Sequence, residues 1–373
     1  MKDKFITLKN EEKAVFALRS LYSANGYSQY KMSKFEEYDL YVRNKDFLIS
    51  DSIITFTDTN GRLMALKPDV TLSIIKNSAD NIGSVEKVYY NENVYRVSKG
   101  AQSFKEIMQV GLECIGNIDD YCLYEVLMLA AKSLKSISSD CVLDLSNLDI
   151  VSDAVDALGV PDACRQNILK CIGEKNLHEI AALCDRFGAD EQAFARLKAL
   201  LSMYGSANKV LPQLRILFGN NSPAVEQLSR VMEALDGAGL GDMVHIDFSV
   251  MHDMNYYNGI VFKGFLNGVP SGVLSGGQYD KLMKKMGRKS GAVGFAVYLD
   301  LLERMTRDDR SFDFDVLLLY DDGCDLSGLS VAVGQLGRDG KTVMVQRTIP
   351  KKLRFCEIYK FNGEGVERLE NNA

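Results

Sequence analysis

Four side chains have the chemistry of a site for a small polar molecule: Asp69, Arg96, Gln109 and Glu113. Carboxylates and a side-chain amide can accept hydrogen bonds from an ammonium group and from ring N–H groups. The guanidinium of Arg96 suits a carboxylate, because a charge-assisted pair is the stronger kind of hydrogen bond. These residues therefore predict a site that holds an ammonium, a carboxylate and a ring N–H group together.

Two tyrosines, Tyr257 and Tyr279, offer rings that could pack on a planar ligand and hydroxyls that could bond its nitrogen. Ordinary explanations stay open for the same residues. Gln109 and Glu113 would share one face of a strand, where they could be solvated or paired across strands. Tyr256 and Tyr257 would point to opposite faces of a strand, so that one of them belongs to the core.

Apolar periodicity and turn residues predict the elements that must position these side chains. Asp58-Thr59-Asn60-Gly61 suits a hairpin turn. Pro68 and Asp69 suit the first turn of a helix that begins there. In chain order, the predicted elements are a helix at 11–25, strands at 53–57 and 63–66, a helix from 68, strands at 88–90, 93–97 and 107–114, and a helix at 121–137.

The sequence character changes at about residue 151, where Ala, Leu and charged residues at helical spacing predict a helical insertion over about 151–240. Strands return at 243–251 and 260–266, separated by the turn-forming pair Asn258-Gly259. The last segment, 312–373, has βαβ character, with strands at 316–320, 342–346 and 356–361. The predicted fold is α+β. Its core at 1–305 is a mixed, mainly antiparallel sheet flanked by helices, with the helical insertion, and a small C-terminal α/β segment follows.

The composition of the 373 residues is that of an ordinary soluble globular protein, with 46% apolar and 25% charged residues. A net charge of −6 argues against a broad nucleic-acid-binding face. The eight cysteines form no C-x-x-C pair, and they are expected to be free thiols of a cytoplasmic protein. We expect no membrane span, and nothing in the sequence indicates a metal or nucleotide cofactor.

Four segments, taken in order, resemble the core of the histidyl-tRNA synthetases and their relatives. They are LKPDVT at 66–71, YR at 95–96 followed by IMQVGLE at 107–113, MNYYNGIVF at 254–262, and SGGQYD at 275–280. The resemblance covers about residues 10–305 and implies a class II aminoacyl-tRNA synthetase-like fold. It places histidine-binding positions at Asp69, Thr71, Gln109, Glu113, Tyr257 and Tyr279, with Arg96 at the position of the motif 2 arginine.

The same comparison shows departures where a synthetase handles ATP. Val97 and Ser98 follow Arg96 in place of the usual R-x-E, and the loop at 99–106 has no arginine. His252 stands where the family has a catalytic arginine, and Leu301 stands where motif 3 ends in arginine. Because removing one transition-state donor costs about 10²–10³ in rate, we expect no adenylation. Lys67 and Met32-Ser33 also depart from the family pattern.

This pattern is similar to the regulatory subunits of ATP phosphoribosyltransferase, which keep a synthetase core without its catalysis. The resemblance implies a cytoplasmic, non-catalytic subunit that assembles with a short-form catalytic subunit and takes histidine as its effector. It also implies a class II-type dimer within a hetero-oligomer, expected as a hetero-octamer, with no tRNA partner and with 312–373 as a reduced anticodon-binding-like segment. An active histidyl-tRNA synthetase, and a histidine-binding module for another partner, remain alternatives.

Overall fold

The computed structural model divides the chain into two compact units, Lys9–Met305 and a smaller one that contains Thr306–Ala373. The residues that the structure describes are 10–44, 53–80, 83–97, 103–219, 222–251, 256–305, 312–363 and 365–371. Within these ranges, no helix combines the length and the apolar character that crossing a membrane would require.

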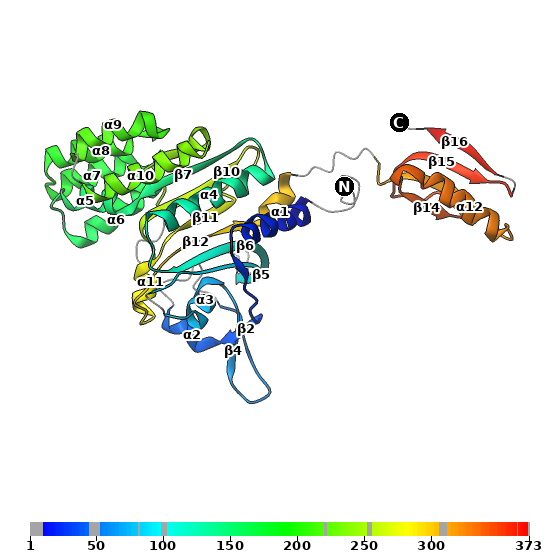
Figure 1. Cartoon of the computed structure of the whole chain (residues 1–373), viewed down its shortest axis with the longest axis horizontal. Helices are drawn as coiled ribbons and strands as arrows, with labels where there is room; N and C mark the ends of the chain where they lie inside the picture. Colours follow the sequence, from blue (N-terminus) through cyan, green and yellow to red (C-terminus); the bar gives the residue numbers. More distant parts are fainter. Residues whose placement is uncertain are drawn as a thin grey trace. The chain divides into compact units, whose positions relative to one another are not determined.

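The larger unit is built on a sheet that has nine strands among the described residues (Figure 1). The run of neighbours β5, β6, β12, β11, β10 and β7 is antiparallel throughout, and so is the pair β9–β8, whereas the pairs β1–β5 and β7–β9 are parallel. The predicted mixed, mainly antiparallel sheet is thereby confirmed. In spatial order the strands are β1 (Ser28–Gln29), β5 (Glu86–Val97), β6 (Phe104–Gly116), β12 (Gly291–Tyr298), β11 (Leu274–Gln278), β10 (Asn258–Leu266), β7 (Cys141–Asn147), β9 (Val244–Asp247) and β8 (Tyr204–Gly205).

One face of the sheet packs under helices α1 (Asn10–Ala24) and α4 (Asp120–Ile137), as Figure 1 shows. Strand alternation sends Val110, Leu112 and Cys114 of β6 into this core, where all three are fully buried. The intervening residues of β6 therefore lie on the opposite face, which carries the polar site.

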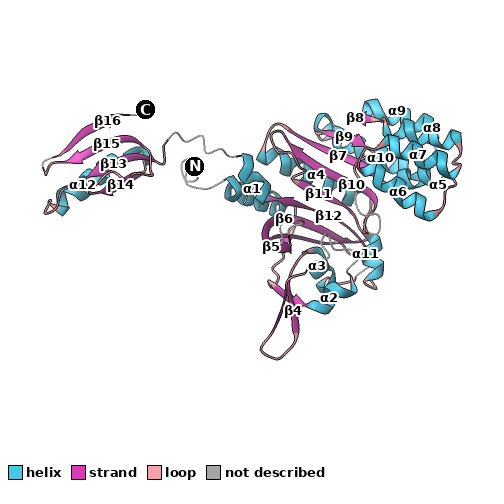
Figure 2. Ribbon diagram, turned by 180° about the vertical axis from the view of Figure 1, so that it is seen from behind, coloured by secondary structure: helices cyan, strands magenta, loops and turns pink. Residues whose placement is uncertain are grey.

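The predicted helical insertion is present, and its helices run from Leu148 to Gly237 rather than over 151–240. Side-chain caps begin several of them, because Asn147, Asn176 and Asp190 each accept a backbone N–H of the following turn. The helices are α5 (Leu148–Asp156), α6 (Asp162–Gly173), α7 (Leu177–Phe187), α8 (Glu191–Leu201), α9 (Ala207–Phe218) and α10 (Pro223–Gly237). They gather beside β7, β9 and β8 (Figure 2).

A small sheet of order β2 (Phe35–Glu37), β4 (Leu63–Leu66), β3 (Thr55–Thr57) lies beside helices α2 (Tyr38–Arg43) and α3 (Thr71–Asn77) (Figure 2). The predicted β3–β4 hairpin is confirmed, and the carboxylate of Asp58 accepts the N–H groups of Asn60 and Arg62 in its turn. The helix predicted to begin at Pro68 begins instead at Thr71. The reason is that the Asp69 carboxylate accepts the N–H of Leu72 from outside the helix.

Two other local predictions were wrong. Asn258 and Gly259 form no turn between strands; they lie at the start of β10, where the register with β11 shifts. Gly259 has φ +56°, and Oε1 of Gln278 accepts the next N–H, from Ile260, so the pair is a bulge. The strand predicted at 243–251 is shorter in the structure, where β9 covers only Val244–Asp247.

Among its described residues, the smaller unit is a four-stranded sheet with one α-helix and one short 3₁₀ helix. The predicted strands are confirmed as β13 (Phe314–Leu319), β14 (Val343–Gln346) and β15 (Phe355–Phe361), with α12 (Leu326–Leu336) between the first two. β13 pairs parallel to both β14 and β15, which is the expected βαβ connection. An unpredicted strand, β16 (Val366–Asn371), adds antiparallel to β15. The remaining short helices are α11 (Asp280–Lys285), η3 (Gly241–Met243), η4 (Leu299–Met305) and η5 (Arg338–Gly340).

Candidate functional site

Glu113 is the centre of the candidate site, on the face of β6 opposite to the one that packs against α1 and α4. Its two carboxylate oxygens accept hydrogen bonds from Thr71 Oγ1 at 2.8 Å and from Tyr279 Oη at 2.6 Å. Glu113 is only 2% exposed. Burial raises its pKa to about 8 and nearby Asp69 adds to this increase, although the two hydroxyl bonds oppose it. The structure thus brings together three predicted site residues, and Glu113 is neither solvated nor merely paired across strands.

Two glycines make room for this arrangement, and the sequence alone did not single them out as site residues. Gly294 lies opposite Glu113 in the β6–β12 register, and a Cβ there would overlap Oε2 of Glu113. Gly111 lies on the same face of β6, and a Cβ there would overlap the hydroxyl of Tyr90. Glycine inside a strand marks a close approach of other groups, and that was the available signal.

Asp69 and Arg96 form the charged margin of the site. Burial raises the pKa of Asp69, whereas its hydrogen bond from the Leu72 N–H and the positive charge of Arg96 lower it. Arg96 is half-buried, and its Nε donates to the carbonyl of Pro68 at 3.1 Å. The guanidinium is thereby held beside the loop that carries Asp69, as a cation among acidic groups.

The predicted tyrosines form an aromatic wall. The ring centroids of Tyr256 and Tyr257 are 4.4 Å apart, and those of Tyr256 and Tyr279 are 5.8 Å apart. Burial raises the pKa of each of the three phenols well above 10. The prediction that Tyr256 and Tyr257 point to opposite faces of a strand was wrong, because both precede β10 and pack against the same cluster.

Gln109 completes the set of predicted residues and is 3% exposed on the face of β6 that carries Glu113. It lies in register with Tyr298 of β12 on one side and Glu92 of β5 on the other. Tyr298 was not predicted as a site residue. Burial raises its pKa and the nearby charge of Arg96 lowers it, so its hydroxyl belongs to the same electrostatic environment.

Lys67, a departure from the family pattern, has a structural partner. Its side chain is fully buried, and its Nζ lies 2.5 Å from Oε2 of Glu92. The backbone carbonyl of Lys67 accepts the N–H of Tyr95, which ties the strand before α3 to β5. This ion pair neutralises the buried positive charge of Lys67. Glu92 could not have been identified as its partner from local sequence.

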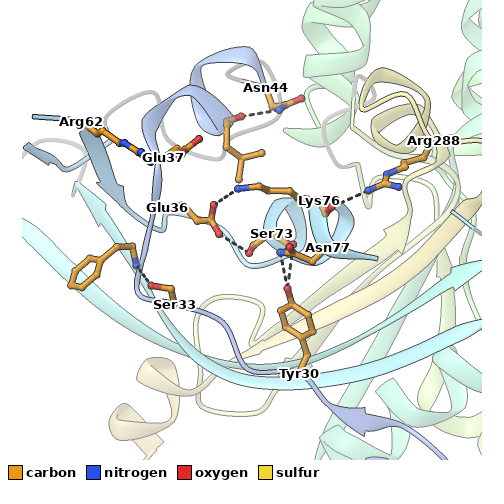
Figure 3. Close-up of polar contacts among 12 residues, drawn as sticks. Tyr30, Ser33, Glu36, Glu37, Asn44, Arg62, Ser73, Lys76, Asn77 and Arg288 are labelled. Atoms are coloured by element: carbon orange, nitrogen blue, oxygen red, sulfur yellow. Dashed lines mark hydrogen bonds and ion pairs between the residues drawn. The ribbon is translucent and has the colours of Figure 1, made fainter. Parts of the chain in front are cut away.

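Helix α3, which presents Thr71, is fixed from its far side by polar contacts (Figure 3). Oε2 of Glu36 accepts from Lys76 Nζ at 2.8 Å, and the Asn77 amide donates to Tyr30 Oη at 3.0 Å. The guanidinium of Arg288 donates to the carbonyls of Ile75 and Lys76 at 2.9 Å, which satisfies acceptors at the helix end. A short helix held in this way can place the Thr71 hydroxyl accurately.

Chemically, the site combines the buried carboxyl group of Glu113, the half-buried carboxyl group of Asp69, tyrosine phenols and one guanidinium. Buried carboxylates are stabilised by a positive partner, so the arrangement suits a ligand that carries an ammonium or a protonated ring. On the predicted ATP side, Leu301 lies in η4 and packs partly buried against the main core. The predicted departures at Ser98 and His252 lie outside the described residues.

The mixed, mainly antiparallel sheet, covered by α1 and α4 on one face and carrying this polar site on the other, defines a class II aminoacyl-tRNA synthetase-like protein. A family model described as Histidyl-tRNA synthetase matches residues 7–302. The chain therefore belongs to the histidyl-tRNA synthetase family, which confirms the predicted family and fold.

Three individual proteins are similar to this chain over most of its length. A protein of Oceanobacillus iheyensis named ATP phosphoribosyltransferase regulatory subunit is 26% identical over 87% of this chain and 81% of its own length. A solved structure from Bacillus halodurans, described as an ATP phosphoribosyltransferase regulatory subunit/histidyl-tRNA synthetase, is similar with a TM-score of 0.71 and 22% identity, over 90% of this chain and 88% of that chain. A chain of the ATP phosphoribosyl transferase (HisG:HisZ) complex from Thermotoga maritima has a TM-score of 0.61 and 20% identity, over 79% of this chain and 98% of that chain.

Proposed function

We propose that this chain is the non-catalytic regulatory subunit of an ATP phosphoribosyltransferase, the enzyme that condenses ATP with phosphoribosyl pyrophosphate at the start of histidine biosynthesis. The observation that carries the proposal is the name of the Oceanobacillus iheyensis relative, which the chain matches over most of both lengths. The likeness to a chain of the Thermotoga maritima complex supports a catalytic-subunit partner, and we propose that this partner is of the short form. We also place the protein in the cytoplasm, where its eight cysteines would stay reduced.

Histidine is the ligand that we propose for the Glu113 site. It brings an ammonium and an imidazole, which suit the carboxyl groups of Asp69 and Glu113, with Gln109 beside them. Its carboxylate suits Arg96, and the tyrosine wall, with Tyr257 and Tyr279, suits a flat ring. Histidine bound here would bias the complex through a coupling free energy between its site and the catalytic subunit, which is feedback inhibition.

The main alternative is an active synthetase. It needs cations around the triphosphate, and the sequence offers Leu301, Ser98 and His252 at positions where the family has arginine or glutamate. A neutral leucine side chain cannot replace a guanidinium that contacts phosphate. We therefore propose that the chain neither activates histidine nor charges tRNA.

Self-association is part of the proposal, as a class II-type dimer within a hetero-octamer. The small β2–β4–β3 sheet supports it, because Phe35, which is 48% exposed, and Phe56, which is 38% exposed, lie on the same face of this sheet. The rings of Phe35 and Phe56 contact each other with centroids 5.2 Å apart, so the apolar surface is continuous. Contiguous exposed apolar surface of this kind marks an association face.

Reconstitution tests the proposal. The purified chain is mixed with the short-form catalytic subunit from the same genome, and phosphoribosyl-ATP formation is measured. We expect activity in the mixture well above that of the catalytic subunit alone. Histidine-dependent exchange of pyrophosphate into ATP by the chain alone would instead support the synthetase, and the absence of stimulation by a folded chain would reject the regulatory role.

A further inference from the structure

A cavity of about 180 Å³ lies where the helical insertion meets the edge of the main sheet, remote in sequence from the Glu113 site. It is formed between α6, α7, the end of α8 and strands β8 and β9, which lie side by side in Figure 2. Its apolar walls include Ile172, Ile180, Leu201 and Met203. Sites for drug-sized ligands occupy about 300–1,000 Å³, so this cavity suits a smaller molecule.

The polar side of the cavity is built around Asp247, which is 5% exposed. Its Oδ1 accepts from the N–H and the hydroxyl of Ser249 at 2.8 and 2.6 Å, and its Oδ2 accepts from Lys175 Nζ at 3.0 Å. Lys175 has φ +56°, an uncommon backbone conformation for a residue other than glycine. The carbonyls of Ile172 and Cys171 accept the N–H groups of Lys175 and Asn176 and hold the loop in this form.

A second carboxylate, Asp144, lies beside Asp247. The parallel β7–β9 register places Asp144 opposite His245, on the face that Asp247 shares two residues later. Asp144 is 7% exposed, and within the described chain its Oδ1 has no hydrogen-bond partner. The nearest candidate, His245 Nδ1, is 4.0 Å away and bonds the hydroxyl of Tyr204 at 3.0 Å.

The charges in this cluster do not balance. Burial and then the negative charge of Asp247 raise the pKa of Asp144 to about 6, against the opposing effect of Lys175. Above that pH, two carboxylates face one ammonium. Lys263 is paired with Asp144 on the neighbouring strand β10, but its ammonium lies over the ring of Phe265, at 5.6 Å from the centroid. Asp247 is the carboxylate that lines the cavity, and Asp144 lies on the neighbouring strand β7 outside the lining, so its negative charge reaches the cavity only as a field beside Asp247. A cation in the cavity would neutralise this excess negative charge.

We propose that this cavity binds a small organic cation, an ammonium group on a compact apolar body. The ammonium lies against Asp247, within the field of Asp144, and the apolar body packs on Ile172, Ile180 and Met203. The walls exclude a nucleotide by size, and the excess negative charge disfavours an anion.

The test uses 3-methylbutylammonium chloride as the probe and the full-length chain as the receptor, with binding measured by calorimetry at pH 7.5. The neutral isostere 3-methylbutan-1-ol and the anionic 3-methylbutanoate are the ligand controls. We expect saturable binding of the amine, at least about tenfold weaker binding of the alcohol, and none of the carboxylate. No binding of the amine, or equal binding of amine and alcohol, would overturn the proposal.

Two variants should change the affinity in opposite directions. Asp144→Asn removes the uncompensated charge and should weaken amine binding about tenfold while alcohol binding is unchanged. Lys175→Asn removes the competing cation, keeps a residue type that tolerates positive φ, and should strengthen amine binding. Asp153→Asn, an exposed carboxylate on α5, is the matched control. If Asp144→Asn does not fold, a fall in amine affinity on Lys175→Asn rejects the site by itself.

Discussion

Glu113 should make the stability of the larger unit depend on pH, and Glu113→Gln should remove that dependence. Burial raises the pKa of Glu113 from 4.5 to about 8, so the folded chain holds this proton more tightly than the unfolded chain. Such a group contributes its full stability below the unfolded pKa, and the contribution is lost as pH rises toward the folded pKa. At about 1.4 kcal/mol per pH unit, the loss reaches about 3 kcal/mol at pH 7 and about 5 kcal/mol above pH 8.

The assay is urea-induced unfolding of wild type and Glu113→Gln at pH 5.5, 7.0 and 8.5, followed by tyrosine fluorescence. Glutamine cannot ionise, and its carbonyl can still accept from Thr71 or Tyr279, so the variant resembles the protonated acid. The difference in free energy of unfolding should shift by about 3 kcal/mol in favour of the variant between pH 5.5 and 8.5. Glu226→Gln, an exposed glutamate on α10, should show no such shift. A difference that is constant with pH would refute the reasoning.

Three further outcomes follow from the same contacts. Gly294→Ala should displace the Glu113 carboxylate and cost about 2 kcal/mol or more in stability, seen as a lower calorimetric midpoint; an unchanged midpoint would contradict the close approach. Lys67→Met should lower the free energy of unfolding by about 3 kcal/mol, because it leaves the Glu92 carboxylate without its cation. Adding Glu92→Gln should recover most of this loss, whereas strictly additive effects in the double-mutant cycle would contradict the ion pair. Phe56→Glu should lower the mass measured by light scattering from that of a dimer to that of a monomer. An unchanged dimer mass would show that the β2–β4–β3 sheet is not the self-association face.

Much of the fold could be predicted because its elements have strong local patterns. The Asp58–Gly61 turn and its flanking strands, the helix α4 and the strands β13, β14 and β15 of the smaller unit follow from periodicity and turn residues, whereas β16 was not predicted. The insertion could be predicted because its composition differs from that of the sheet, although its ends were displaced by a few residues. Element ends depend on capping contacts, such as Asn147 before α5, which periodicity does not encode.

The site could be predicted only as a set of residues. Thr71 and Glu113 are 42 residues apart and Glu113 and Tyr279 are 166 apart, so their hydrogen bonds depend on the assembled sheet. Local patterns could not show that Gly294 admits the carboxylate or that Glu92 neutralises Lys67. The error over Tyr256 has the same origin, because strand alternation was assumed before the strand begins.

Histidine inhibition of the reconstituted complex tests the central claim most directly. Phosphoribosyl-ATP formation would be titrated with histidine at pH 8.5 in complexes that contain either the wild-type chain or Glu113→Gln. We expect equal rates without histidine. The histidine concentration that halves the rate should be about 10–100-fold higher in the variant complex, because one charge-assisted bond is lost. Identical inhibition of the two complexes, with both chains folded and bound, would contradict the claim that histidine acts through Glu113.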